Sequence, residues 1–131
     1  MAKAKQITAW VENKPGELGR IARVLGDAKV NITAFTCFPT TAESPLRLQV
    51  SSPAKAKKVL QELGVRVTEE EVLRLTANDK PGVLGEIGRR LGEANINVEY
   101  GFATVAKGAR KVDVVLGVSD LAGASRALRG L

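Results

Sequence analysis

Two tetrapeptides of nearly identical sequence have residue types suited to binding a small anion. Residues 13–16 read Asn-Lys-Pro-Gly, residues 79–82 read Asp-Lys-Pro-Gly, and a helical pattern follows each. In a turn that starts at the Lys, Pro is the second residue and Gly the third, as a type II turn requires. A helix that begins after such a turn has about four backbone N–H groups without partners and roughly half a positive charge at its N-terminus. The two turns therefore predict places that could receive a carboxylate without a catalytic side chain.

Other features of the turn residues also suit the binding of a small ligand. Gly16 and Gly82 lack a Cβ atom and allow the backbone to approach a ligand closely. Asn13 and Asp79 have side-chain oxygen atoms that can accept hydrogen bonds from a ligand ammonium group. A structural interpretation stays open beside the binding one, because the same residues also make a good turn and helix start.

Two further residue pairs have both a binding and a structural interpretation. Gly19 and Gly85 lie in the first turn of each predicted helix, where Gly costs up to about 1 kcal/mol relative to Ala. Close contact with a ligand would explain that cost, and so would tight packing of the helix on a sheet. Asn31 and Asn97 lie where each helix gives way to a strand, a place where Asn commonly acts as a turn or cap residue, with ligand contact as the alternative.

An internal repeat accounts for these pairs. Residues 14–31 realign on residues 80–97 without a gap, and 11 of the 18 aligned positions are identical. Such similarity at a fixed offset indicates two copies of one structural module. We therefore predict two domains, at residues 1–70 and 71–131.

The hydrophobic periodicity predicts the same element order in both copies. In the first copy we expect strands and helices in the order β-α-β-β-α-β, at residues 6–12, 18–28, 30–38, 46–50, 53–63 and 65–67. The second copy repeats the first five, at residues 72–77, 84–94, 96–105, 111–116 and 119–128. This order predicts an α+β protein of two ferredoxin-like modules, each an antiparallel sheet with its helices on one face. The acidic run at residues 69–71 is expected to be a solvated connection between them.

The second copy has no room for its own final strand. Val65 of the closing strand in the first copy would realign on residue 131, the last of the sequence. The first strand of the second module would then be an exposed sheet edge, which natural proteins normally cover. We expect a strand from elsewhere to cap this edge, first of all from a second molecule.

The composition excludes several kinds of chemistry. The 131 residues include no His and one Cys, Cys37, so internal disulfides, Ser-His-Asp triads, histidine relays and the common zinc sites are excluded. Cys37 would need an activating cation to act as a nucleophile, and we predict no catalytic residue, metal or cofactor. The apolar stretches are shorter than a membrane helix requires and the N-terminus lacks a signal-peptide core, so we expect a soluble cytoplasmic protein without a membrane partner.

The net charge of +6 raises nucleic acid as a partner. RNA-recognition modules share the predicted element order, but their signature is a run with aromatics that stack bases. Phe35 and the pair Gly101-Phe102 are the nearest approximations to such a run. RNA binding is therefore a weaker alternative for this chain.

The repeated motifs resemble those of the ACT domain, a small-molecule-binding module found in regulators of amino-acid metabolism. The resemblance lies in Lys-Pro-Gly-x-Leu, a helix ending in Leu-Gly-(Asp/Glu)-Ala, and Val-Asn-Ile or Ile-Asn-Val before the next strand, and it covers both copies. It is strongest to the stand-alone tandem ACT proteins. The resemblance implies a βαββαβ fold, pairing of ACT units through their sheets, and amino-acid binding near the loop between first strand and first helix. The ligand positions that it implies are Asn13, Pro15, Gly16, Glu17, Leu18, Asn31, Asp79, Pro81, Gly82, Val83, Leu84 and Asn97.

These observations favour a non-catalytic regulatory module that binds a free amino acid at ACT–ACT interfaces and transmits this allosterically. Its expected partners are a second copy of the chain, in a homodimer, and a metabolic enzyme or regulator. The alternative is a protein-docking subunit that binds no ligand. Neighbouring strand residues would choose the ligand side chain, although they also suit the core or an interface: Trp10, Phe35, Thr36, Tyr100 and Phe102.

Overall fold

The computed structural model describes residues 2–40, 42–105 and 107–131, which form two compact units. The first unit comprises residues 5–70. The second comprises residues 71–131 together with residues 2–4. Each unit has its own cluster of buried apolar side chains, so each has the core expected of a separate module.

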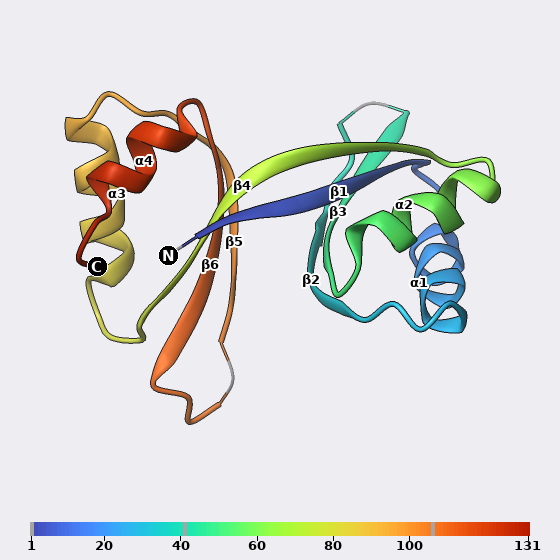
Figure 1. The fold of residues 1–131 in the computed structure, drawn as a ribbon, viewed down its shortest axis with the longest axis horizontal. Helices are drawn as coiled ribbons and strands as arrows, with labels where there is room; N and C mark the ends of the chain where they lie inside the picture. Colours follow the sequence, from blue (N-terminus) through green and yellow to red (C-terminus); the bar gives the residue numbers. More distant parts are fainter. Residues whose placement is uncertain (1, 41, 106) are drawn as a thin grey trace. The chain divides into compact units, whose positions relative to one another are not determined.

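The first unit is built in the order β-α-β-β-α-β. Its elements are β1 (Ala2–Glu12), α1 (Glu17–Asp27), β2 (Ile32–Cys37), β3 (Glu43–Val50), α2 (Pro53–Glu62) and the first part of β4 (Arg66–Asn78). The strand order is β2-β3-β1-β4, and β3 pairs antiparallel with both β1 and β2. Both helices lie on one face of the sheet (Figure 1), where Ile21, Leu25 and Leu60 pack against Ile7 and Leu48.

The second unit repeats this plan. After the second part of β4 come α3 (Val83–Glu93), β5 (Val98–Thr104), β6 (Lys111–Val118) and α4 (Leu121–Ala127). The pairs β4–β6 and β5–β6 are antiparallel, and β2 and β5 have a bulge at equivalent places. Ile87 and Leu91 of α3 and Leu128 after α4 are buried against Leu75 and Leu116 of the sheet. The expected α+β fold of two ferredoxin-like modules is confirmed.

The fourth strand of the second unit comes from the start of the same chain. Residues 2–4 belong to the second unit, and β1 is the neighbour of β4 in the strand order. Strands β1 and β4 run antiparallel. The Thr8 side chain is hydrogen-bonded to Glu70 and the Trp10 side chain to Thr68, so the residue number rises along β1 as it falls along β4. The expectation that a second molecule would first of all supply this strand is therefore wrong. The local pattern showed that a strand was missing, but pairing across more than 60 residues of chain decides which segment replaces it.

The acidic run between the modules is part of a strand, not a loop. β4 extends without interruption through Glu69, Glu70 and Glu71. Glu69 forms ion pairs of 3.3 Å with Lys5 and with Lys57 of α2. Hydrogen bonds from these two ammonium groups lower the pKa of the Glu69 carboxyl. Basic partners on neighbouring elements thus allow acidic residues in a row to lie in one strand.

A buried polar network lies on the face of the first sheet that points away from its helices. Gln49 donates to the Gln6 side-chain oxygen at 2.9 Å, and Gln6 donates to Glu70 at 3.2 Å. Thr8 also donates its hydroxyl hydrogen to Glu70. Gln6, Thr8 and Gln49 are all less than 5% exposed. Because unpartnered buried polar groups are costly, these bonds offset the cost of burying the three side chains.

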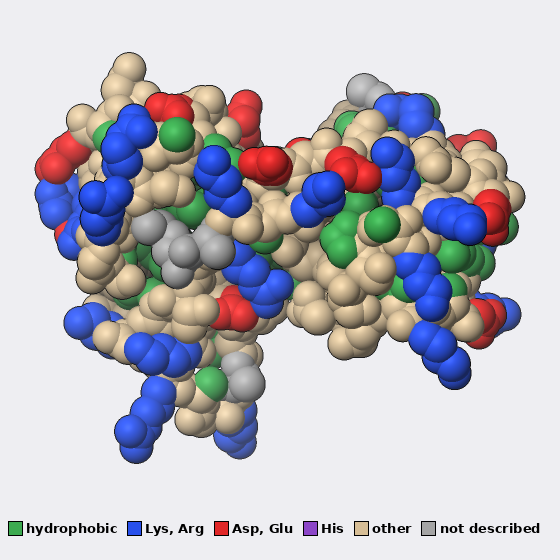
Figure 2. Space-filling view, in the orientation of Figure 1, with side chains coloured by type: hydrophobic (Ala, Val, Ile, Leu, Met, Phe, Trp, Pro, Cys, Tyr) green, Lys and Arg blue, Asp and Glu red, His purple; other side chains and the backbone are tan. Residues whose placement is uncertain are grey.

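Lys and Arg side chains are interspersed with acidic ones over much of the face that Figure 2 shows, but several lie together without acidic neighbours at the lower left, over the hairpin of β5 and β6. Arg66, Arg74, Arg89 and Arg90 all form ion pairs with carboxylates of their own unit. No helix in the described part of the chain is long and apolar enough to cross a membrane.

Candidate functional site

The two predicted turns have the same backbone geometry. Gly16 and Gly82 both have a φ of +91°, in the left-handed region that only Gly adopts without strain, and each precedes the first residue of a helix. No described side chain forms a capping hydrogen bond at either helix start. By contrast, the Asp120 side chain accepts a hydrogen bond of 3.0 Å from the backbone N–H of Gly123 at the start of α4. The starts of α1 and α3 thus have backbone donors that no side chain caps.

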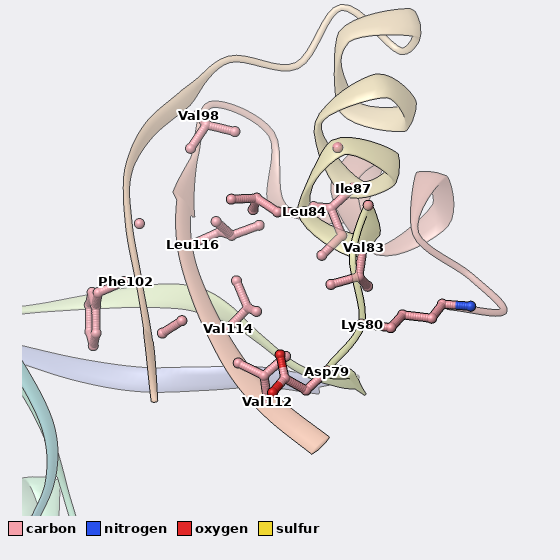
Figure 3. A pocket seen from close by; sticks show the side chains of 14 residues that line it. Asp79, Lys80, Val83, Leu84, Ile87, Val98, Phe102, Val112, Val114 and Leu116 are labelled. Atoms are coloured by element: carbon pink, nitrogen blue, oxygen red, sulfur yellow. The ribbon is translucent and has the colours of Figure 1, made fainter. Parts of the chain in front are cut away.

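A pocket of about 620 Å³ opens beside the start of α3 in the second unit. Its walls come from the turn, from α3 and from the helix-covered face of β5 and β6. Val83, Leu84 and Ile87 of α3 point toward Val114 and Leu116 of β6 (Figure 3). The remaining lining residues are Asp79, Lys80, Gly82, Gly85, Val98, Gly101, Phe102, Ala103 and Val112. The pocket is therefore almost wholly apolar, with its polar groups at the turn.

One carboxylate marks the turn end of this pocket. In Figure 3 the Asp79 carboxylate lies beside Val112 at the edge of the pocket, whereas the Lys80 side chain points away from it. The Asp79 backbone N–H donates to the carbonyl of Arg110 at 2.9 Å, which ties the turn to the residue just before β6. Asp79 and the backbone at Gly82 therefore offer an acceptor for an ammonium group and donors for a carboxylate within one turn.

The equivalent pocket in the first unit has a volume of only about 150 Å³. Glu17, the counterpart of Val83, lines it and is only 9% exposed. The Arg20 guanidinium donates to both Glu17 carboxylate oxygens, at 3.2 and 2.9 Å. These hydrogen bonds, chiefly, lower the pKa of Glu17, so the carboxylate is held ionised and in place. The Glu17 side chain is thus fixed at the wall of the small pocket, whereas Arg20 lines the separate hollow beside α1.

Small residues of strand β5 also line the large pocket of the second unit. Gly101 lies opposite Leu116, and its counterpart Phe35 lies opposite Leu48 in the same register. A Cβ atom built on Gly101 would lie 2.9 Å from Leu116 Cδ2, so the missing side chain of Gly101 would face the pocket wall. Ala103 stands in place of Cys37 in the same way. Gly101 and Ala103 are smaller than their counterparts Phe35 and Cys37. Of these two counterparts only Cys37 lines the small pocket, and Phe35 is 51% exposed.

The implied ligand positions divide into those that meet at these pockets and those that do not. Asp79, Gly82, Val83 and Leu84 line the large pocket; Asn13, Glu17 and Leu18 line the small one. Gly16 lies instead at a hollow beside α1, whereas Pro15, Pro81, Asn31 and Asn97 line none of these.

Asn31 and Asn97 use their backbone to join two elements. The Asn31 N–H donates to Ser51 Oγ at 2.9 Å, and the Asn97 N–H donates to Ser119 Oγ at 3.0 Å. Each Asn carbonyl in turn accepts the backbone N–H of the same serine. These contacts support the structural interpretation of the two positions.

Tight packing does not explain the helix glycines. A Cβ atom built on Gly19 or Gly85 would meet no neighbouring atom within 4 Å. Gly85 lines the large pocket, so its missing side chain widens the pocket mouth. The packing interpretation of these glycines is therefore wrong.

Of the five aromatic and strand residues considered for side-chain selection, Phe102 alone lines the large pocket, and its ring points away from it (Figure 3). Trp10 lies elsewhere: its indole N–H donates to Thr68 at 2.9 Å, and Arg66 stacks over its ring at 4.6 Å. The pocket is lined instead by aliphatic residues of β5 and β6. The signal that could have found them is the replacement of Phe35 by Gly101 between aligned repeats.

The charged face of α3 lies away from the pocket residues. Glu86 pairs with Arg89 at 2.6 Å and with Arg90 at 2.9 Å, and Arg89 also pairs with Glu93 at 2.8 Å. Hydrogen bonds from the two guanidinium groups lower the pKa of Glu86 to about 2. Arg90 donates to the carbonyl of Arg129, which links α3 to the residues after α4. Among the described residues, no group of three or more Asp, Glu or Cys side chains is placed to hold a metal ion.

The repeat, the strand order and the paired turns define a protein of two ferredoxin-like modules with uncapped first helices. Residues 2–118 match the family model described as the ACT domain pair. The chain therefore belongs to the ACT domain pair family, as its motifs indicated.

Individual relatives share this architecture. The structure of protein BT0572 from Bacteroides thetaiotaomicron has a TM-score of 0.89 and 26% identity, over 97% of this chain and 87% of that one. The regulatory subunit of aspartate kinase from Thermus thermophilus has the same fold, with a TM-score of 0.70 and 13% identity, over 96% and 92% of the chains. The aspartokinase of Corynebacterium glutamicum is 24% identical over 97% of this chain. The chain spans only about a third of that enzyme's length.

Proposed function

We propose that this protein is a non-catalytic regulatory module that binds a free amino acid beside the strand-to-helix turn and transmits the binding to a partner protein. The observation that carries the proposal is the pocket of about 620 Å³ at the start of α3. It combines an apolar interior with Asp79 and an uncapped helix start at one end. An α-amino acid has matching parts: an ammonium group, a carboxylate and a side chain.

The charges of the turn suit these ligand groups. The Asp79 carboxylate would accept hydrogen bonds from the ammonium group, and the free N–H groups of the first turn of α3 would donate to the carboxylate. The aliphatic walls would then surround the side chain, as in most small-molecule sites. None of these steps needs a nucleophile or a general base.

The relatives suggest the kind of partner. One solved relative is a regulatory subunit of aspartate kinase, and the curated relative is an aspartokinase several times longer than the matched segment. We therefore propose that the partner is an enzyme or regulator of amino-acid metabolism. A ligand can change the partner only if it binds one arrangement of the module more tightly than another.

A thermal-shift screen of the full chain tests the proposal. Each of the twenty amino acids would be added at millimolar concentration and the midpoint of unfolding measured. A ligand that binds only the folded state stabilises it by about 2.7 kcal/mol when its concentration is a hundred times Kd. A rise in the midpoint for one amino acid or a related group is expected; no rise for any of them would contradict the proposal.

A protein-docking role without ligand has its own supporting observation. Phe35 and Phe38, in and beside β2, are 51% and 45% exposed, and β2 is a sheet edge of the first unit. Exposed aromatic side chains at a sheet edge suit contact with another protein, including a second copy of the chain. Homodimer formation through these edges would be measured by light scattering after gel filtration. Phe35→Ser should lower the apparent mass if β2 forms the dimer.

A further inference from the structure

The two units differ at the place where the proposed ligand would lie. The pocket between the turn and the sheet has a volume of about 620 Å³ in the second unit and about 150 Å³ in the first. A separate hollow of about 430 Å³ in the first unit is lined only by Gly16 and residues of α1, with no wall from the sheet. Their turns, by contrast, have the same φ of +91° and the same uncapped helix start. The difference therefore comes from side chains, not from the backbone of the turns.

We infer that only the second unit binds the ligand, and that the ligand is a free amino acid with a large apolar side chain. This inference rests on the proposed function and adds the number of sites and the ligand class. The first unit then acts as a scaffold, although its sequence repeats the motif.

In the first unit, the charged side chain of Glu17 lies in the pocket. Glu17 lies in the small pocket at 9% exposure, and two hydrogen bonds to Arg20 hold its carboxylate. The buried Glu17 side chain takes up space that a ligand carboxylate would need beside the start of α1. The counterpart Val83 has no charge, and Glu86, at the position of Arg20, is engaged by Arg89 and Arg90.

The walls of the second pocket determine the ligand class. Its interior is formed by Val98, Val112, Val114, Leu116 and Ile87, and Asp79 is the one lining carboxylate. The Lys80 side chain points away, so it offers no partner inside the pocket. A Lys, Thr or Glu side chain would lose hydration there without gaining hydrogen bonds, whereas a Leu, Ile or Phe side chain would gain burial.

Calorimetric titration of the full chain tests both parts. L-leucine, L-isoleucine and L-phenylalanine would be compared with glycine, L-threonine and L-lysine. We expect one equivalent per chain, and at least tenfold tighter binding for one of the apolar three than for the other group.

A matched pair of variants locates the site. Ala103 and Cys37 occupy equivalent, exposed positions on β5 and β2, each at the edge of its pocket. Ala103→Leu narrows the second pocket and should weaken binding at least tenfold. Cys37→Leu makes a similar change in the first unit and should leave binding unchanged, within twofold.

A double variant introduces the Glu17–Arg20 pair of the first unit into the second. Val83→Glu combined with Glu86→Arg places the first unit's ion pair at the start of α3 and should remove binding, whereas Glu86→Arg alone should retain it. Circular dichroism and the unfolding midpoint show whether each variant is folded.

The outcomes separate this inference from the proposed function. If no free amino acid binds, both fail. If two equivalents bind, if polar amino acids bind as tightly, or if Cys37→Leu weakens binding as much as Ala103→Leu, the proposed function stands and this inference is overturned.

Discussion

Glu17 and Val83 occupy equivalent positions in the two repeats, each the first residue of a helix after a Gly with φ +91°. Glu17 is buried at its pocket and paired with Arg20, whereas Val83 is an uncharged wall of a pocket about four times larger. One position thus makes two nearly identical turns chemically different.

Replacement of a helix glycine by alanine should raise the stability of either unit, but weaken ligand binding only in the second. Gly85→Ala meets no atom within 4 Å, so it should raise the free energy of unfolding by about 0.5 kcal/mol through helix propensity. Because Gly85 lines the large pocket, the same change should raise the ligand Kd several-fold. Gly19→Ala is the control, with the same gain in stability and no change in Kd. Urea unfolding and calorimetry measure the two effects.

The ion pairs of Glu86 should contribute to stability in a defined pH range. Its folded-state pKa is lowered from 4.5 to about 2 by Arg89 and Arg90. A carboxyl whose pKa is lowered by folding stabilises the protein above its unfolded-state pKa, and this contribution is lost as the pH falls through the folded-state value. The unfolding midpoint of Glu86→Gln should therefore lie below wild type at pH 6. The gap should narrow between pH 4.5 and 2, and a gap that is constant with pH would contradict this assignment.

Removal of residues 1–4 should weaken the second unit rather than the first. Residues 2–4 complete its sheet beside β4, so their loss would expose a strand edge and several backbone hydrogen-bonding groups. We expect a loss of about 2 kcal/mol and faster amide hydrogen exchange in residues 71–78. Lys3→Ala retains the backbone and should change neither. Equal effects of the deletion on both units would contradict the shared-strand arrangement.

Lys29 is in a strained backbone conformation that its counterpart tolerates better. Lys29 and Asn95 follow α1 and α3 with φ values of +63° and +58°, in the left-handed region where Asn is several-fold enriched. Lys29→Asn should therefore raise the free energy of unfolding by about 0.5 kcal/mol, and Asn95→Lys should lower it by a similar amount. Urea unfolding of both variants would show opposite shifts; shifts of the same sign would rule out this explanation.

Much of the fold could be predicted because its signals are local. The Pro-Gly turns, the apolar stripe of α1 at Ile21 and Leu25, and the same stripe at Ile87 and Leu91 each depend on residues within a few positions. The repeat gave this evidence twice for the first five elements of the module. The helix starts and the absence of a final strand in the second copy follow from these local patterns alone.

Other features depended on residues far apart in the sequence. The acidic residues Glu69 and Glu70 lie in a strand because Lys5, Lys57 and Thr8 provide their partners. A run of acidic residues indicates a solvated loop when those partners are unknown. Most of the candidate site also escaped prediction, because β5 and β6 provide its walls.

What the sequence determined by itself was the module, its repetition and the two turns, because backbone preferences of Pro and Gly and the helical period act over short distances. Only the tertiary structure decided that residues 2–4 complete the second unit, and that Val83 and Ala103 line a large pocket where Glu17 and Cys37 line a small one. Strand partners and cavities arise from packing between distant segments. A change of a few side chains there alters the space that remains, while the repeated motif stays the same.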